Sequence, residues 1–369
     1  MGGSSYGTIF KITTWGESHG KALGVVVDGC PAGLALSEAD IQPYLDRRKP
    51  GQSRISTPRR EDDEVEILSG VFEGLTTGTP ISLIVKNTSQ RSADYGEIAS
   101  YYRPGHADYT FDAKYGFRDY RGGGRSSGRE TIGRVAAGAI AAKLLSLLGI
   151  RVTAYTRSIG PIMADLSAFD REAILRTPTA MPDYHASLRA ESYLRDTMEA
   201  LDSAGGVMEC LVEGMPAGIG EPVFDKLDAC LSKAVMSIGA VKAVEIGDGI
   251  KVSEAKGSDN NDVFYMDGSK VSKRTNHAGG ILGGISDGSP ILVRAHVKPT
   301  PSIFRTQETV DKNNRDISVQ IKGRHDPVIV PRAVVVMEAM VALTIADALL
   351  LNMSAQTEHM IQFYHRPLL

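Results

Sequence analysis

Two glycine-rich segments, one in each half of this chain, follow the same residue pattern. Residues 69–81 (SGVFEGLTTGTPI) align without gaps with residues 279–291 (GGILGGISDGSPI), and the two share three glycines, a proline and an isoleucine. Upstream of them, residues 28–36 (DGCPAGLAL) are similar to residues 213–221 (EGMPAGIGE), in the same order. This ordered similarity predicts a duplicated αβ unit with pseudo-twofold symmetry. The alternative is shared turn chemistry, because glycine and proline recur in turns of any fold.

A looser match follows downstream, where each half begins a long apolar stretch. Residues 124–134 (GRSSGRETIGR) correspond to residues 323–332 (GRHDPVIVPR), and each segment leads into apolar residues at helical spacing. If the halves are duplicated, the two Gly-Arg helix starts face each other across one site.

Helical periodicity alternates with short runs that are typical of β-strands, such as ISLIVK. Apolar residues repeat at helical spacing at about 127–148, 224–238 and 332–351. Ser127 followed by Glu130 matches a capping box, which predicts that the first helix starts just after a cluster of glycines. We therefore expect a fold that mixes sheets and long helices.

No linker, repeat array or low-complexity segment divides the chain, so we expect a single domain over residues 1–369. The polar residues 254–276 are expected to form a surface loop. The cysteines are odd in number and lack metal-ligand spacing, which predicts a reduced, cytoplasmic protein without a cysteine metal site. They are Cys30, Cys210 and Cys230.

Charge and hydropathy argue against nucleic-acid and membrane partners. The formal net charge is −3, which does not favour general binding to phosphate backbones or anionic membrane surfaces. The first twenty residues have no basic start followed by an apolar stretch, so no signal peptide is expected. The most apolar window, 333–351, contains Glu338 and Asp347, which predicts a buried helix and not a membrane span.

The glycine cluster at 120–128 has the composition of an anion site. Backbone N–H groups at a helix start, with serine hydroxyls and arginines, can cradle a phosphate or a carboxylate. The segment is neither a Walker A loop, since no Gly-Lys-Ser/Thr follows, nor a dinucleotide fingerprint, since residues 113–120 (AKYGFRDY) do not form a preceding strand. The alternative is a solvated arginine face, against which the flanking glycines argue. The arginines are Arg121, Arg125, Arg129 and Arg134.

Two histidines and one aspartate lie in turns where they can act on protons. They are His19 in TTWGESHGKALG, His106 in YYRPGHADYT and Asp326 in GRHDP. Each has a structural alternative: a hydrogen-bonded structural histidine in the first two cases, and an ion pair with the nearby Arg324 in the third. Serine-hydrolase and zinc chemistry have little support, because no Gly-x-Ser-x-Gly elbow occurs and the histidines are scattered.

Taken together, these stretches resemble one family, the chorismate synthases, over essentially the whole chain. The matching motifs are GESHG (16–20), RRKPGQSR (47–54), RPGHADYT (103–110), RGGGRSSGRETIGRVAAGA (121–139), AVKAVEIGDG (240–249), NHAGGILGGIS (276–286), KPTPSI (298–303) and GRHDP (323–327). So many matches in the same order make a chance resemblance negligible.

The resemblance implies a fold, a reaction and a cofactor. The implied fold is an α+β, β-α-β sandwich, with antiparallel sheets outside long central helices, assembled as a homotetramer. The implied reaction is the 1,4-anti elimination of phosphate from 5-enolpyruvylshikimate 3-phosphate to give chorismate, the last shikimate-pathway step toward the aromatic amino acids. It makes the chain a carbon–oxygen lyase that requires reduced FMN without net redox change. The chain has no extra length for a reductase domain, so NADPH is expected to act indirectly, through a separate flavin reductase.

The resemblance also implies roles for individual residues. His19 would protonate flavin N1 or hold the reduced anion there, His106 would protonate the departing phosphate, and Asp326 would help take a proton from flavin N5. Ser18 and Ser127 would support these groups by hydrogen bonds. Substrate anions would be bound by Arg48, Arg54, Arg103, Arg129 and Arg324, of which Arg48 and Arg54 also have positions suited to NADPH. FMN would be bound by Arg125, Ser126, Ser127, Gly239, Ala240, Gly283, Lys298, Pro299, Thr300, Pro301, Ser302 and Arg324.

Two other function classes stay open at this stage. One is a flavoprotein oxidoreductase that uses FMN for net electron transfer. The other is an anion- or nucleotide-binding module without catalytic activity. The state of the flavin after turnover and the release of phosphate would discriminate among the three.

Overall fold

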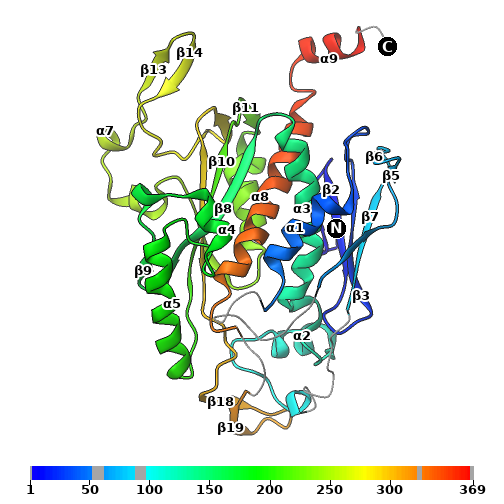
Figure 1. Cartoon of the computed structure of the whole chain (residues 1–369), viewed down its shortest axis with the longest axis vertical. Helices are drawn as coiled ribbons and strands as arrows, with labels where there is room; N and C mark the ends of the chain where they lie inside the picture. Colours follow the sequence, from blue (N-terminus) through cyan, green and yellow to red (C-terminus); the bar gives the residue numbers. More distant parts are fainter. Residues whose placement is uncertain (1, 52–61, 88–96, 322–325, 366–369) are drawn as a thin grey trace.

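Two antiparallel sheets lie on either side of a pair of long helices, α3 (Thr131–Ser146) and α8 (Val330–Asn352) (Figure 1). The computed structural model describes residues 2–51, 62–87, 97–321 and 326–365. The two helices pack against each other in the middle; α3 also packs on the first sheet and α8 on the second. Buried residues of both sheets and both helices belong to one hydrophobic cluster. The expected mixture of antiparallel sheets and long helices is confirmed.

The N-terminal sheet is antiparallel throughout and has the strand order β1-β2-β3-β7-β4. Every second residue of β7 is buried, as expected for a strand with one face on a core. The apolar side chains on this face pack toward α3. The strands are β1 (Ser5–Tyr6), β2 (Lys11–Gly16), β3 (Ala22–Asp28), β4 (Val65–Ile67) and β7 (Ile81–Lys86).

The C-terminal sheet is also antiparallel and has the order β12-β17-β10-β8-β9. The burial of β17 alternates in the same way as that of β7, with the buried face toward the helices. The strands are β8 (Arg151–Ile159), β9 (Ile162–Met163), β10 (Gly206–Glu213), β12 (Val241–Ile246) and β17 (Ile291–Val297).

The similar segments of the two halves occupy corresponding places in these sheets. Residues 28–36 follow β3, which pairs with β7, and residues 213–221 follow β10, which pairs with β17. A short hairpin precedes the partner strand in each half. The hairpin strands are β5 (Val71–Phe72) and β6 (Leu75–Thr76) in the first half, and β15 (Ile281–Leu282) and β16 (Ile285–Asp287) in the second.

Helix α8 lies in the core, as its sequence predicts. It is long and apolar enough to cross a membrane, but 72% of its most apolar window is buried inside the structure. Its two acidic residues are held by hydrogen bonds. Glu338 accepts from Arg47 and from the backbone of Ala154. Asp347 accepts from three consecutive backbone N–H groups of residues 8–10 and ties the N-terminal segment to the helix.

The start of α3 differs from the predicted one. The helix begins at Thr131, after two 3-10 turns, η3 (Gly124–Ser126) and η4 (Gly128–Glu130). Ser127 accepts from the backbone of Arg129 and caps η4, whereas the Glu130 side chain pairs with Arg134 and does not close a capping box. The backbone of Ser127 is extended, with φ −71° and ψ 146°, so the regular helix cannot start there.

Other sequence expectations also need adjustment. Helix α6 (Leu227–Met236) is shorter than the periodicity suggests, because the 3-10 turn η6 (Val223–Asp225) replaces its start. Residues 254–276 are not only loop: they contain α7 (Gly257–Asn260) and an exposed hairpin of β13 (Phe264–Asp267) and β14 (Lys270–Lys273). Both faces of this short hairpin are largely exposed, so its residues do not alternate between apolar and polar. The sequence pattern therefore did not predict the hairpin.

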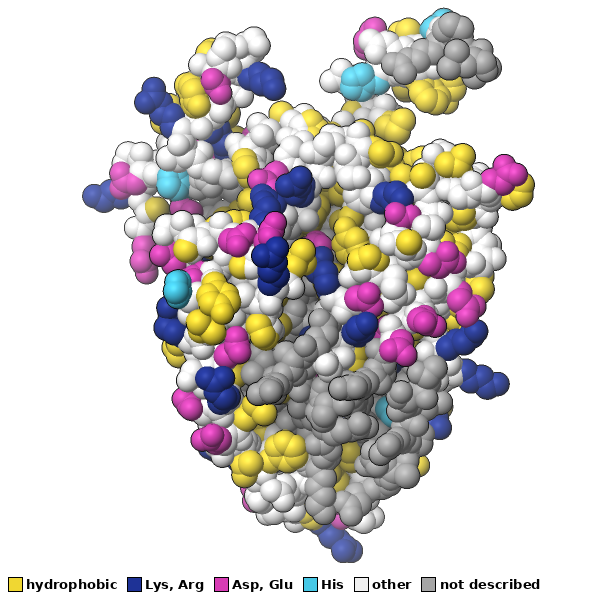
Figure 2. All heavy atoms as spheres, viewed as in Figure 1, with side chains coloured by type: hydrophobic (Ala, Val, Ile, Leu, Met, Phe, Trp, Pro, Cys, Tyr) yellow, Lys and Arg dark blue, Asp and Glu magenta, His cyan; other side chains and the backbone are white. Residues whose placement is uncertain are grey.

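The remaining elements surround this framework. The β13–β14 hairpin and α9 project from one end of the molecule, and β18–β19 lies at the other (Figures 1 and 2). On the face in Figure 2, acidic and basic side chains are interspersed. The remaining helices and strands are α1 (Glu38–Arg48), α2 (Asp108–Tyr115), α4 (Arg171–Arg176), α5 (Tyr184–Glu199), α9 (Thr357–Tyr364), β11 (Ala217–Gly220), β18 (Thr306–Val310) and β19 (Asp316–Gln320).

Candidate active site

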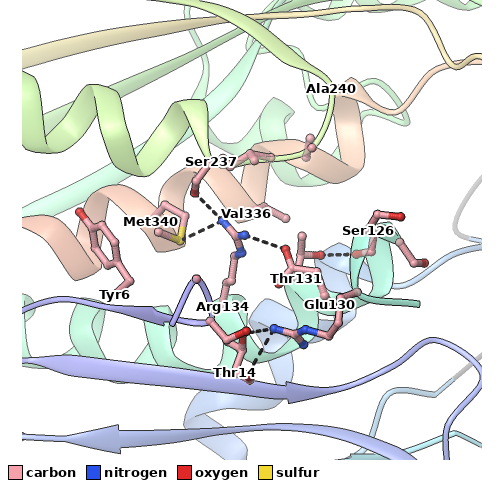
Figure 3. Close-up of a pocket in the computed structure, with 18 of the residues that line it drawn as sticks. Tyr6, Thr14, Ser126, Glu130, Thr131, Arg134, Ser237, Ala240, Val336 and Met340 are labelled. Atoms are coloured by element: carbon pink, nitrogen blue, oxygen red, sulfur yellow. Dashed lines mark hydrogen bonds and ion pairs between the residues drawn. The ribbon is translucent and has the colours of Figure 1, made fainter. Parts of the chain in front are cut away.

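A cavity of about 1640 Å³ is lined by residues from both halves of the chain. The glycine cluster and the start of α3 contribute from the first half, and α8 and the segment after α6 contribute from the second. Figure 3 shows this arrangement, with Thr131 and Arg134 of α3 facing Val336 and Met340 of α8. The N-terminal segment lines the far end, where the Tyr6 hydroxyl lies 2.7 Å from Thr344 Oγ1.

The glycine cluster forms a turn that only glycine accommodates easily. Gly122, Gly123 and Gly124 have φ angles of 67°, 83° and 51°. A Cβ atom on Gly122 would lie 2.1 Å from His19 Nδ1, so the backbone approaches that ring closely. The turn presents Arg125, Ser126 and Ser127 to the cavity.

Two arginines of this segment are held by protein groups across the cavity. Arg125 donates from Nη2 to Thr14 Oγ1 at 2.6 Å and from Nη1 to the Gly16 carbonyl at 3.1 Å. Arg134 reaches from α3 to Ser237 Oγ at 2.6 Å, near the end of α6 (Figure 3). These contacts join the N-terminal sheet and α6 to the cavity wall.

Arg48 and Arg129 share a carboxylate that the sequence analysis did not single out. Arg48 Nη2 lies 2.5 Å from Asp63 Oδ2, and Arg129 Nη2 lies 3.3 Å from Asp63 Oδ1. Arg129 also donates to Asn87 Oδ1 at 2.8 Å. The sequence signal for this carboxylate was the acidic run at 61–64, which directly follows two arginines. A run of charges does not show which of its members is buried.

Asp326 lies on the cavity wall beside an arginine that the sequence analysis also missed. Arg332 Nη1 lies 2.5 Å from Asp326 Oδ2, and Arg332 Nε donates to the Arg48 carbonyl at 3.1 Å. Burial lowers the pKa of the Arg332 guanidinium, and the nearby Arg48 adds to that effect. Arg332 therefore links Asp326, near the start of α8, to the backbone of Arg48.

His106 lies on the cavity wall with both ring nitrogens in hydrogen bonds. Its Nδ1 lies 2.9 Å from the Pro104 carbonyl, and its Nε2 lies 2.9 Å from Ser302 Oγ. A carbonyl only accepts, so Nδ1 carries a proton in every protonation state of the ring. Lys298 donates to the Gly105 carbonyl at 2.9 Å, which holds the 298–302 segment against this loop.

Arg103 is bound within its own loop. Its Nε and Nη2 atoms each lie 2.8 Å from an oxygen of Asp108, in a bidentate pair. Burial raises the pKa of Asp108, but the Arg103 fork outweighs that effect and leaves the pKa below its ordinary value. Arg103 lines the cavity with its charge already paired.

His19 is buried directly behind the glycine turn. Its Nδ1 lies 3.1 Å from Ser18 Oγ, and that hydroxyl donates to the Gly122 carbonyl at 3.1 Å. Because the hydroxyl proton goes to the carbonyl, Ser18 Oγ is left to accept from His19, so Nδ1 is the protonated nitrogen here too.

Most of the predicted site residues come together on the cavity wall. Ser18, His19, Gly283 and Pro299 are not among the described residues that line it, and Gly283 lies in the turn between β15 and β16. Arg54 and Arg324 fall outside the part of the chain that the structure describes. The lining residues are Arg48, Arg103, His106, Arg125, Ser126, Ser127, Arg129, Gly239, Ala240, Lys298, Thr300, Pro301, Ser302 and Asp326.

Comparisons with known proteins agree with one another. The family model described as chorismate synthase matches residues 10–350. The chorismate synthase of Agathobacter rectalis is 64% identical over 366 residues, covering 99% of this chain and 100% of that protein. The one from Lachnoclostridium phytofermentans is 65% identical over 367 residues, with the same coverage. A crystal structure of chorismate synthase superposes with a TM-score of 0.77 at 32% identity and covers 97% of each chain. The chain belongs to the chorismate synthase family.

Proposed function

We propose that this chain converts 5-enolpyruvylshikimate 3-phosphate to chorismate and inorganic phosphate, with reduced FMN as cofactor. The family assignment makes it a lyase. The observation that best supports the proposal is that His106, Asp326 and the Arg48–Arg129 pair line the same cavity. That wall combines proton-transfer groups with guanidinium groups, as the removal of phosphate from an anionic substrate requires.

The residues present fit a flavin phosphate and ring system. Gly128 and Gly239 line the cavity and have no atom within 4 Å of the place a Cβ would take, so the backbone is open to a ligand there. Thr300 Oγ1 is buried and, among the described residues, has no hydrogen-bond partner. When bound, reduced FMN supplies electron density to the elimination without net redox change. The residues that would hold it are Arg125, Ser126, Ser127, Gly239, Ala240, Lys298, Thr300, Pro301 and Ser302.

Arg48 and Arg129 would bind the anionic groups of the substrate. Guanidinium groups hold carboxylate and phosphate groups in a fixed geometry. This orientation lowers the entropic part of the activation barrier. Arg48 is 2% exposed, so water does not screen its charge effectively.

His106 would protonate the departing phosphate. With Nδ1 held by the Pro104 carbonyl, the transferable proton is the one on Nε2, beside Ser302. In the neutral ring Nε2 accepts from Ser302 Oγ, and in the charged ring it donates. The proton therefore enters and leaves at one defined atom on the cavity wall.

Asp326 and His19 would act toward the flavin. Asp326, oriented by Arg332, would take up a proton from flavin N5. His19 would hold a proton at flavin N1, and its orientation would depend on Ser18 and the Gly122 turn. Ser127, which caps η4, would support the turn on the cavity side.

The organisation of the chain completes the proposal. The matching positions of similar segments in the two sheets support a duplicated αβ unit with pseudo-twofold symmetry, arranged as a β-α-β sandwich in a single domain. We further propose a cytoplasmic homotetramer whose reduced FMN comes from a separate NADPH-dependent flavin reductase.

Phosphate release from 5-enolpyruvylshikimate 3-phosphate, measured anaerobically with and without chemically reduced FMN, tests the function. The expected result is release that requires reduced flavin and leaves it reduced. A flavin that ends oxidised in proportion to product would indicate an oxidoreductase. No release with demonstrably reduced FMN would leave an anion-binding module as the better description.

A further inference from the structure

Asp63 is a buried carboxylate between two arginines that line the cavity. Its side chain is 0% exposed, and its oxygens lie 2.5 Å from Arg48 Nη2 and 3.3 Å from Arg129 Nη2. Among the described residues, Asp63 is behind the cavity lining and not part of it. Its contacts therefore act on the two arginines and not on a ligand directly.

The backbone at Asp63 is also unusual. Its φ angle is 49°, in the left-handed region of the backbone. Among residues with a side chain, asparagine, aspartate and histidine adopt this region most often. Non-glycine residues in this region are concentrated at functional sites, where the surrounding structure holds them in place. Here the local conformation directs a carboxylate inward, just before β4, to the point where Arg48 and Arg129 approach each other.

Asp63 and a backbone carbonyl hold the Arg48 guanidinium in place. Arg48 uses Nη2 for Asp63 and Nη1 for the Gly128 carbonyl, at 3.3 Å. Its Nε is buried and has no hydrogen-bond partner among the described residues. Without the Asp63 carboxylate, the positive charges of Arg48 and Arg129 would repel each other. The two guanidinium groups would then lose their fixed orientation.

We propose that Asp63 is a positioning residue that sets substrate specificity: it fixes the Arg48 and Arg129 forks and removes one unit of positive charge from the site. A site with aimed forks and moderate charge selects an anion whose groups match the forks. A site with loose forks and higher charge attracts small anions of any shape. The inference depends on the proposed substrate role of the two arginines.

Asp63→Asn tests the proposal, because asparagine keeps the size, tolerates the positive φ and removes only the charge. We expect the KM for 5-enolpyruvylshikimate 3-phosphate to rise at least about tenfold, as for a broken buried charge pair. The inhibition constant of inorganic phosphate should stay within about twofold or fall, since the net charge becomes more positive. The Kd of FMN should change less than about twofold, because Asp63 contacts no proposed flavin residue.

A merely structural role would weaken substrate, phosphate and FMN in parallel, and that result would overturn the proposal. An unchanged KM would overturn it too. Arg48→Lys and Arg129→Lys distinguish an error in the substrate role of the arginines from an error in the role of Asp63. If both leave KM unchanged, the substrate role of the arginines is wrong; if both raise it while Asp63→Asn does not, only the role of Asp63 is wrong.

Asn87→Ala provides a second variant in case Asp63→Asn does not fold. It removes the acceptor that holds Arg129 from the other side, at 2.8 Å, without unpairing a buried carboxylate. It also removes the Nδ2 donor to the Glu17 and Gly20 carbonyls, so kcat is measured beside KM to separate an effect on the His19 turn. The proposal predicts a smaller rise in substrate KM, about threefold to tenfold for the loss of the two hydrogen bonds from Arg129, with phosphate inhibition unchanged. An unchanged KM would contradict the proposal that substrate binding requires a fixed orientation of the Arg129 guanidinium.

Discussion

His106 and His19 are each oriented by a hydrogen bond from Nδ1 to an acceptor close in the chain, but only the acceptor of His19 is itself fixed by a distant segment. His106 Nδ1 donates to the carbonyl of Pro104, two residues earlier in the same loop. His19 Nδ1 donates to Ser18, whose hydroxyl is fixed by the Gly122 carbonyl, 104 residues away. The tautomer of His106 is thus set locally, whereas that of His19 depends on how the glycine turn packs.

The two rings also differ in where they lie. His106 lies on the cavity wall beside Ser302, and His19 lies behind Gly122. This difference predicts that His106 tolerates changes in its surroundings and that His19 is sensitive to them. The variants below test that comparison, from the largest expected effect to the smallest.

His106→Ala should have the largest effect, because it removes the proposed proton donor itself. General acid catalysis contributes typically about 10²–10⁴-fold, so kcat for phosphate release should fall by that range while substrate still binds. Steady-state phosphate release and a direct binding measurement would check both parts. A loss of less than about tenfold would show that another group protonates the phosphate.

Gly122→Ala should come next, through His19. The new Cβ would lie 2.1 Å from His19 Nδ1, at a φ of +67°, so the ring must move. Displacement of a catalytic group by about 1 Å can lower the rate about 10²-fold. We expect a loss of that order in phosphate release.

Gly124→Ala is the matched control for that variant. Its φ is +51° and no atom lies within 4 Å of the new Cβ, so it has the backbone strain without the collision. Such strain destabilises by roughly 1–2 kcal/mol, which a melting curve would detect. Equal losses of activity in Gly122→Ala and Gly124→Ala would contradict the proposed contact with His19.

Ser18→Ala removes the acceptor of His19 Nδ1, so this hydrogen bond no longer fixes the tautomer. A typical hydrogen bond contributes about 1 kcal/mol, so we expect roughly a fivefold loss in kcat. The measurement is the same phosphate assay, at saturating reduced FMN so that weaker flavin binding does not contribute.

Ser302→Ala should have the smallest effect. His106 loses its Nε2 partner but keeps the Pro104 carbonyl, so ring orientation and tautomer stay defined. We expect a loss of about twofold to threefold, below that of Ser18→Ala. A larger loss in Ser302→Ala than in Ser18→Ala would reverse the comparison.

The helices were largely predictable from the sequence, because apolar spacing records which face is buried. The segment 332–351 predicted α8 within two residues at its start and one at its end. Helix α1 was not predicted, although Ser37 and Asp40 form a capping box at its start, because few of its residues are apolar.

The sequence predicted which residues belong to the site but not which of them contact one another. Motifs identified His106, Asp326 and most of the cavity wall. Arg332 ends the segment 323–332 but lies outside the GRHDP motif, and Asp63 lies in a run of acidic residues that the sequence does not distinguish. Which carboxylate meets which guanidinium depends on the packing of α1 and α8, and no single-sequence pattern records that.

The pH dependence of the His106→Ala deficit tests the central comparison most directly. The second pKa of a phosphate monoester is about 6, so at lower pH the substrate phosphate already has the proton that His106 would supply. We expect the ratio of wild-type to His106→Ala phosphate release to shrink as the pH falls from 8 to 6, while the ratio of wild-type to His19→Ala release stays constant. A His106→Ala deficit that is constant over this range would contradict proton donation by His106.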